Sequence, residues 1–248
     1  MTGFLASVST AGEAEIVLAA GADIIDLKDP QTGALGALPA PAIREAVQAI
    51  AGRKVVSATA GDLPMVPQIV ADAVVRIAGL GVDIVKIGFF RGGEWAGCLD
   101  ALSRQAAAGT RLVAVMFADQ YPDLAMLPRL RDAGFVGAML DTANKQGGGL
   151  RDHLTEAALA AFVQAAARDG LMSGLAGSLT LADIAPLLRL APDYLGFRGA
   201  LCRAGRTSTL DPDLVRSVRD AIGRTHQPST ARIAIAAAGA QRDAHSRV

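Results

Sequence analysis

The chain has 248 residues, of which 51% are hydrophobic and 19% charged, and its formal net charge is zero. This length suits one large α/β domain or two small ones, with ample apolar material for a core. A neutral chain with 4% aromatic residues lacks the basic surface and stacking platforms of nucleic-acid-binding proteins. The sequence has no apolar run of about 18 residues and no basic, apolar leader, so we expect a cytoplasmic protein without a membrane partner.

Short apolar runs alternate with amphipathic stretches from one end of the chain to the other. The runs predict strands over Phe4–Val8, Asp23–Leu27, Val55–Thr59, Asp83–Gly88, Arg111–Phe117, Gly137–Leu140, Leu171–Ala176 and Tyr194–Phe197. The stretches between them predict helices from Ser9 or Thr10 to Ala20, and over Pro39–Ile50, Pro67–Leu80, Glu94–Ala108, Leu124–Ala133, Leu154–Arg168, Leu181–Leu190 and Pro212–Ile222.

Strict alternation of eight β and eight α segments predicts the α/β class and a (β/α)8 TIM barrel over residues 1–223. The alternative, a doubly wound sheet, needs a glycine-rich first βα turn, and residues 7–11 contain no glycine. Residues 224–248 combine an alanine-rich patch with a polar end. We expect a flexible tail outside the barrel there, with a surface helix as the alternative.

Lysines are rare in this chain and are placed unevenly. The 24 basic residues comprise 20 arginines and four lysines, which are Lys28, Lys54, Lys86 and Lys145. Lys28, Lys86 and Lys145 lie at or just after the ends of predicted strands, where TIM barrels carry their active sites, whereas Lys54 lies at the opposite end. Lysine can lose its proton and form an imine, which arginine cannot do.

Carboxylates accompany these lysines. Asp26 precedes Lys28 by two residues on the same strand face, Asp141 precedes Lys145 by four, and Asp62 and Asp119 follow other strands. An amine with a usual pKa of about 10.4 attacks a carbonyl well only where burial or a nearby cation lowers that pKa. The pattern therefore favours Schiff-base chemistry, with aspartates as proton carriers. Buried structural salt bridges are the alternative interpretation.

A phosphate site is predicted after the seventh and eighth strands, where barrels of this type commonly bind phosphate with backbone amides. Gly177 and Gly199 allow close approach of the backbone, Ser178 can donate a hydrogen bond, Arg198 can add charge, and Ala200 follows in the same turn. Two ordinary glycine-bearing turns are the alternative. Cys98, Cys202 and the three histidines form no ligand cluster, so we expect no metal and no cofactor.

Several of these segments together resemble (5-formylfuran-3-yl)methyl phosphate synthases, also called 4-(hydroxymethyl)-2-furancarboxaldehyde-phosphate synthases. The longest match is the stretch from Asp23 to Gly36, and shorter ones begin at Val56, Asp83, Leu140, Leu175 and Arg198. The resemblance implies a TIM-barrel carbon–oxygen lyase that condenses two molecules of glyceraldehyde 3-phosphate, with loss of phosphate and water. The product would feed a methanofuran-type cofactor of one-carbon metabolism.

Carried over by motif, the resemblance implies that Lys28 forms the Schiff base and that Lys86 accepts a proton. Asp26, Asp141 and Lys145 match further active-site positions, and Asp62 is a candidate for positioning a substrate hydroxyl. Two other functions remain open from the residues themselves. One is a class I aldolase or isomerase acting on another phosphosugar, and the other is a non-catalytic phosphosugar-binding barrel. The sequence leaves the oligomeric state open, a homo-oligomer included.

Overall fold

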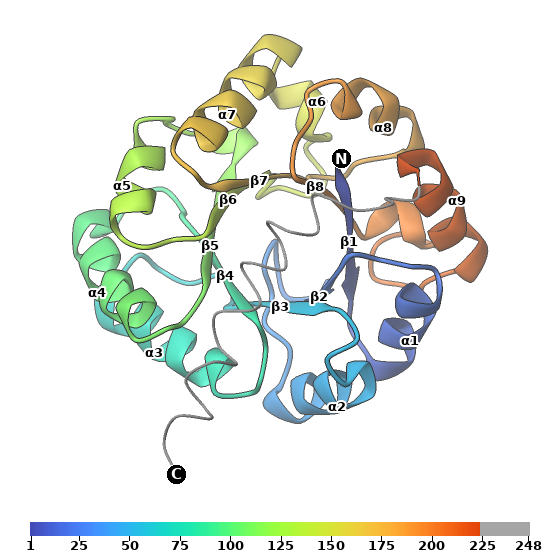
Figure 1. Ribbon diagram of the computed structural model, residues 1–248, viewed down its shortest axis with the longest axis horizontal. Coiled ribbons are helices and arrows are strands. Elements are labelled where there is room, and N and C mark those ends of the chain that lie inside the picture. Colours follow the sequence, from blue (N-terminus) through green and yellow to red (C-terminus); the bar gives the residue numbers. More distant parts are fainter. Residues whose placement is uncertain (224–248) are drawn as a thin grey trace.

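The computed structural model describes residues 1–223, and the predicted tail of residues 224–248 lies outside the described residues. Eight parallel strands form a closed barrel in chain order, with β8 pairing with β1 (Figure 1). The prediction of a (β/α)8 barrel is confirmed. The strands are β1 (Gly3–Val8), β2 (Ile24–Leu27), β3 (Val55–Thr59), β4 (Ile84–Gly88), β5 (Leu112–Phe117), β6 (Gly137–Asp141), β7 (Met172–Leu175) and β8 (Tyr194–Phe197).

The helices form the outer ring seen in Figure 1. They are α1 (Ala11–Ala19), α2 (Ala40–Ile50), α3 (Pro67–Ala78), α4 (Trp95–Ala107), α5 (Met126–Asp132), α6 (Leu150–His153), α7 (Glu156–Arg168), α8 (Leu181–Leu188) and α9 (Pro212–Ile222). Three short elements were not predicted: α6 and the 3-10 turns η1 (Ala118–Gln120) and η2 (Gly199–Leu201). All three follow strands, in the connections that surround the mouth of the barrel.

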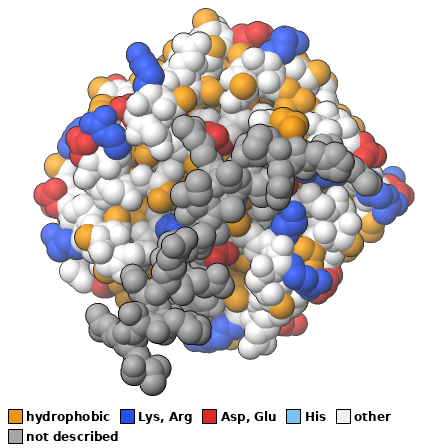
Figure 2. All heavy atoms as spheres, viewed as in Figure 1, with side chains coloured by type: hydrophobic (Ala, Val, Ile, Leu, Met, Phe, Trp, Pro, Cys, Tyr) orange, Lys and Arg blue, Asp and Glu red, His pale blue; other side chains and the backbone are white. Residues whose placement is uncertain are grey.

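The strands are buried on both faces, which explains their short, apolar sequences. One apolar cluster lies between the strands and the helices, and a second fills the barrel interior with side chains such as Met139, Met172 and Tyr194. On the face shown in Figure 2, most visible charged side chains lie over the helices at the rim. Within residues 1–223, no helix is both long enough and apolar enough to cross a membrane.

The amino-terminal end of the barrel is built from a repeated helix-to-strand connection. Gly21 and Gly81 have φ angles of 83° and 88°, which end the preceding helices in a left-handed residue as predicted. Two residues later, Asp23 and Asp83 each accept a hydrogen bond from a backbone N–H of a neighbouring strand, at 2.8 Å in both cases. These aspartates therefore join strands at the end of the barrel away from the predicted site.

The carboxyl-terminal mouth is closed on one side by apolar side chains. Leu35, from the β2–α2 connection, is fully buried and belongs to the interior cluster, and Phe90 lies 4.4 Å from Phe117 between ring centroids. This packing needs a glycine at the end of β4, because a Cβ on Gly88 would lie 2.5 Å from Phe90 and 2.8 Å from Leu35. The mouth is left open beside β6, β7, β8 and β1.

Candidate active site

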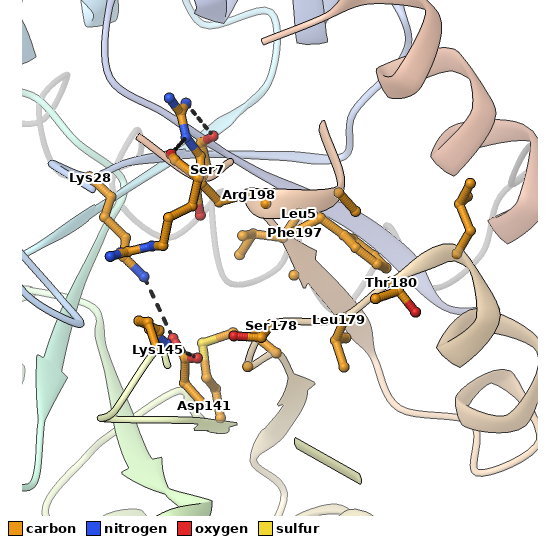
Figure 3. A pocket seen from close by; sticks show the side chains of 18 of the residues that line it. Leu5, Ser7, Lys28, Asp141, Lys145, Ser178, Leu179, Thr180, Phe197 and Arg198 are labelled. Carbon is orange, nitrogen blue, oxygen red and sulfur yellow. Dashed lines mark hydrogen bonds and ion pairs between the residues drawn. The ribbon is translucent and has the colours of Figure 1, made fainter. Parts of the chain in front are cut away.

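A cavity of about 610 Å³ occupies the open side of the barrel mouth. Its lining includes Lys28 at the end of β2, Asp141 at the end of β6 and Lys145 in the β6–α6 connection (Figure 3). Lys86 on β4 lines the same cavity. The structure thus brings together all three lysines that the sequence placed at strand ends. Lys28, Lys86 and Asp141 meet there because inward positions on the strands and at their ends converge on the barrel axis, and Lys145 is carried there by its connection.

The deeper of two charged groups, here called the deep cluster, consists of Ser7, Asp26, Ser57 and Lys86. Asp26 is completely buried and pairs in register with Ser7 on β1 and Ser57 on β3. Its carboxylate accepts hydrogen bonds from Ser7 Oγ at 2.9 Å, Ser57 Oγ at 2.6 Å and Lys86 Nζ at 2.9 Å. The negative charge of Asp26 is therefore balanced by Lys86 and not by Lys28.

The second group, here called the mouth cluster, consists of Lys28, Asp141 and Lys145. Asp141 Oδ2 lies 3.5 Å from Lys28 Nζ, and Asp141 Oδ1 lies 2.5 Å from Lys145 Nζ. Lys145 Nζ also lies 3.3 Å from Thr142 Oγ1. Figure 3 shows Lys28 directed across the cavity toward Asp141. One carboxylate thus serves two ammonium groups at this level of the barrel.

The surroundings of Lys28 in the mouth cluster lower the pKa of its amine. Burial reduces the pKa of Lys28 from 10.5 to about 8; Asp141 opposes this shift, and the charges of Lys145 and Lys86 add to it. Burial would raise the pKa of Asp141, but Lys145 and Lys28 outweigh that effect and hold it well below its usual range. Lys28 can therefore become a neutral nucleophile near neutral pH while Asp141 stays ionised.

Two exposed or half-buried aspartates anchor the connections on either side of the cavity. Asp119 accepts hydrogen bonds from the backbone N–H groups of Ala143 and Asn144, at 2.8 and 2.7 Å, and so holds the connection that carries Lys145. Asp62 accepts the backbone N–H groups of Ala34 and Leu35, at 2.8 and 2.6 Å. Asp62 does not line the cavity, and its oxygens already hold the β2–α2 connection rather than pointing to a substrate.

The predicted phosphate-binding turns line the opposite part of the cavity from Lys86. Within residues 1–223, the backbone N–H groups of Gly177, Ser178, Gly199 and Ala200 donate to no acceptor. Ser178 has a positive φ of 49°, an uncommon conformation for a residue that carries a side chain. A Cβ on Gly177 would lie 3.0 Å from Thr142, so the close approach of these two connections requires glycine. These amides can bind an anion.

The side chain of Arg198 is used differently from the prediction. Its Nε donates to Arg206 O, Nη1 to Ser7 O and Glu13 Oε2, and Nη2 to Glu13 Oε1 and Ser208 O. These five hydrogen bonds use every N–H of the guanidinium. Figure 3 shows Arg198 turned toward Ser7 and away from Lys145. The Arg198 side chain thus has no donor left for a phosphate and instead fixes the β8–α9 connection.

Arg206 also lines the cavity, although it was not among the residues predicted from the sequence. It is one arginine among many, in a loop well past the end of β8, so no local pattern sets it apart. Within residues 1–223, His, Cys, Asp and Glu side chains form no group of three that could hold a metal ion. The cationic groups of the cavity are suited to an anionic, carbonyl-bearing substrate.

A sequence profile described as 4-HFC-P synthase matches residues 4–219 of the chain. A protein of Methylorubrum extorquens is 48% identical over 210 residues, which cover 84% of this chain and 86% of the relative. The (5-formylfuran-3-yl)methyl phosphate synthase of Methanococcus aeolicus is 36% identical over 219 residues, which cover 83% and 93%. The enzyme of the same name from Methanopyrus kandleri is 36% identical over 215 residues, which cover 82% and 91%.

Solved structures resemble the chain in fold. Phosphoribosylanthranilate isomerase from Thermotoga maritima superposes with a TM-score of 0.62 at 11% identity, covering 91% of this chain and 100% of that one. The 3-hexulose-6-phosphate synthase from Salmonella typhimurium gives a TM-score of 0.59 at 19% identity, covering 89% and 98%. At these identities the similarity concerns the barrel architecture alone.

Proposed function

Because this chain belongs to the 4-HFC-P synthase family, we propose that Lys28 is the amine with which it condenses two molecules of glyceraldehyde 3-phosphate. Membership makes the chain an enzyme, a lyase that forms (5-formylfuran-3-yl)methyl phosphate in methanofuran biosynthesis. The observation that carries the assignment of Lys28 is its burial in the cavity wall with a pKa of about 8.

In the first steps, neutral Lys28 attacks the carbonyl carbon of one triose phosphate, after isomerisation to the ketone, and loss of water gives a protonated imine. Removal of the α-proton converts the imine into an enamine, whose carbon attacks the aldehyde of the second triose phosphate. Elimination of one phosphate, ring closure in which a substrate hydroxyl displaces the Lys28 amine from its carbon, and further loss of water give the furan and free Lys28. The proton of the α-carbon must reach a base that lies inside the cavity.

Lys86 is the proposed base, and Asp26 is its counter-ion. Lys86 lines the same cavity as Lys28, and its Nζ lies 2.9 Å from Asp26 Oδ2. In the resting site Lys86 is the ammonium partner of Asp26, so it first gives its proton to the carbinolamine hydroxyl, which leaves as water. Neutral Lys86 then takes the α-proton, and the fully buried carboxylate, held by two serine hydroxyls, again neutralises its charge. Asp26 thus supports proton transfer through Lys86 and has no direct contact with the substrate in this mechanism.

Asp141 and Lys145 are proposed to balance charge in the mouth of the barrel. The low pKa of Asp141 keeps it anionic, so it can stabilise the positive charge that the imine of Lys28 acquires. Lys145 offsets part of that negative charge and keeps the pKa of Lys28 low before the reaction. The free amides of Gly177, Ser178, Gly199 and Ala200 would bind one substrate phosphate.

Borohydride trapping tests the role of Lys28. With glyceraldehyde 3-phosphate and borohydride, we expect irreversible loss of activity and a reduced adduct on the peptide that contains Lys28. Lys28→Arg should form no adduct, and its rate of furan formation, measured by ultraviolet absorbance, should fall by more than about 10³-fold. Lys54→Arg, at the other end of the barrel, is the matched control and should keep both the adduct and the rate. Full labelling of Lys28→Arg would refute the assignment, and a retro-aldol or isomerised product without a furan would refute the function.

A further inference from the structure

Arg206 presents a half-buried guanidinium to the active-site cavity from the β8–α9 connection. Its Nη2 donates to Gly33 O, in the β2–α2 connection, at 3.1 Å. Within residues 1–223, this is the single hydrogen bond that the guanidinium makes, so four of its five N–H groups are free. A guanidinium in a cavity wall with four free donors can bind an anion without first breaking contacts within the protein.

The backbone around Arg206 is fixed although its guanidinium is largely free. Arg198 Nε donates to Arg206 O at 2.8 Å, and Arg198 Nη2 donates to Ser208 O at 2.8 Å. Arg198 is in turn held by both carboxylate oxygens of Glu13, at 2.6 and 3.2 Å. The buried Arg198–Glu13 pair therefore presets where the side chain of Arg206 begins, which lowers the entropic cost of binding with it.

The charges of the cavity leave Arg206 without a carboxylate partner. Arg198 is balanced by Glu13 and Lys86 by Asp26. The remaining charged groups in the wall are three cations, Lys28, Lys145 and Arg206, and one anion, Asp141. Burial lowers the pKa of Arg206 and the charge of Arg198 adds to this shift, whereas the more distant carboxylates of Asp141, Asp62 and Asp29 oppose it without forming an ion pair. An anion at this position would offset the excess of positive charge.

We propose that Arg206 binds the phosphate of one of the two triose phosphates, and so forms a second anion subsite beside the β2–α2 connection. The backbone of Arg206 lies on the β8–α9 connection, as do Gly199 and Ala200, but its guanidinium reaches across to Gly33 O of the β2–α2 connection. A phosphate monoester carries between one and two negative charges at neutral pH, and the planar guanidinium can bind two of its oxygens. The inference rests on the proposed function, since that reaction brings two phosphates into one cavity.

The test compares Arg206→Gln with Arg203→Gln, which removes an exposed arginine of the same connection that does not line the cavity. Furan formation is measured over a range of glyceraldehyde 3-phosphate concentrations, and again with inorganic phosphate as an inhibitor. For Arg206→Gln we expect the half-saturating substrate concentration and the inhibition constant of phosphate to rise together, by about 10- to 100-fold. For Arg206→Lys both constants should lie between those of Arg206→Gln and the parent, because lysine keeps the positive charge but lacks the planar guanidinium that binds two oxygens at once.

A purely structural role, as a tie between two connections through Gly33 O, would lower the maximal rate or the melting temperature without changing inhibition by phosphate. That result, or equal constants for Arg206→Gln and Arg203→Gln, would overturn the proposal. If the parent protein forms no furan, the proposed function fails by itself. Calorimetric titration with inorganic phosphate then decides the subsite independently, with weaker binding to Arg206→Gln than to Arg203→Gln expected.

Discussion

The barrel holds two lysine–carboxylate groups at different depths, and they differ in how their charges are balanced. In the deep cluster, one carboxylate faces one ammonium and two hydroxyl groups; all four side chains are buried, and Ser7 and Lys86 also reach the cavity wall. In the mouth cluster, one carboxylate faces two ammonium groups beside a cavity. The excess cation in the mouth makes it easier for one lysine to release its proton, whereas the deep pair has no such excess.

This difference assigns distinct chemistry to lysines that look alike in the sequence. Lys28 has the lowered pKa that a nucleophile needs. Lys86 has a dedicated counter-ion that can stabilise it after it has accepted a proton. The two roles are kept apart because the ion pair of Asp26 lies within the deep cluster and both ion pairs of Asp141 lie within the mouth cluster.

The largest loss of activity is expected when the amine of the deep cluster is removed. Lys86→Gln should reduce furan formation by about 10² to 10⁴-fold, since the base is lost, while borohydride labelling of Lys28 continues. It should also reduce the free energy of unfolding by about 3–5 kcal/mol, because Asp26 is left as an unpaired buried charge. Urea unfolding and the ultraviolet assay measure the two effects.

The double variant Lys86→Gln with Asp26→Asn separates the loss of stability from the loss of catalysis. With neither charge present, most of the lost stability should return while activity remains low. A double variant as unstable as Lys86→Gln alone would contradict the pairing of these two residues. Normal activity in either variant would contradict the role of Lys86 as the base.

The pH dependence of kcat/KM tests the charge balance of the mouth cluster. Since neutral Lys28 is the reactive form and its pKa is about 8, kcat/KM should rise about tenfold per pH unit below pH 8 and level off above it. In Lys145→Gln a cation that lowers this pKa is gone, so the pKa rises and the inflection moves to higher pH. The variant should be slow near pH 7 and approach the parent at high pH.

Lys145→Arg is the control for this pH shift, because it keeps the positive charge beside Asp141. Its kcat/KM should still level off near pH 8. A loss of rate in Lys145→Gln that is equal at every pH would mean that Lys145 acts otherwise than through the pKa of Lys28.

The barrel was predictable from the sequence because its strands are short apolar runs and its helices end at glycines such as Gly21 and Gly81. The position of the site followed from the same pattern, since strand ends converge at the mouth of a barrel. Three lysines selected by their positions do line one cavity. Their catalytic roles, and those of the selected aspartates, remain predictions.

The pairing inside the site could not be predicted from spacing along one strand. Asp26 and Lys28 share a strand face, but lysine is long and neighbouring strands are staggered, so Asp26 pairs with Lys86 from β4. The use of Arg198 depends on Glu13, a residue from the far end of the sequence. Contacts of this kind arise from closure of the barrel, and no local pattern in the sequence indicates them.

The smallest expected effect concerns the two aspartates that anchor the connections. Asp119→Ala should reduce kcat/KM several-fold and move its pH inflection slightly upward, because the connection that carries Lys145 loses two hydrogen bonds from its backbone. Asp62→Ala loses two equivalent bonds in the β2–α2 connection and should leave the inflection unchanged. Each substitution should lower the free energy of unfolding by about 1–3 kcal/mol. Equal shifts of the inflection in both variants would show that general loosening of the mouth, and not the position of Lys145, controls the pKa of Lys28.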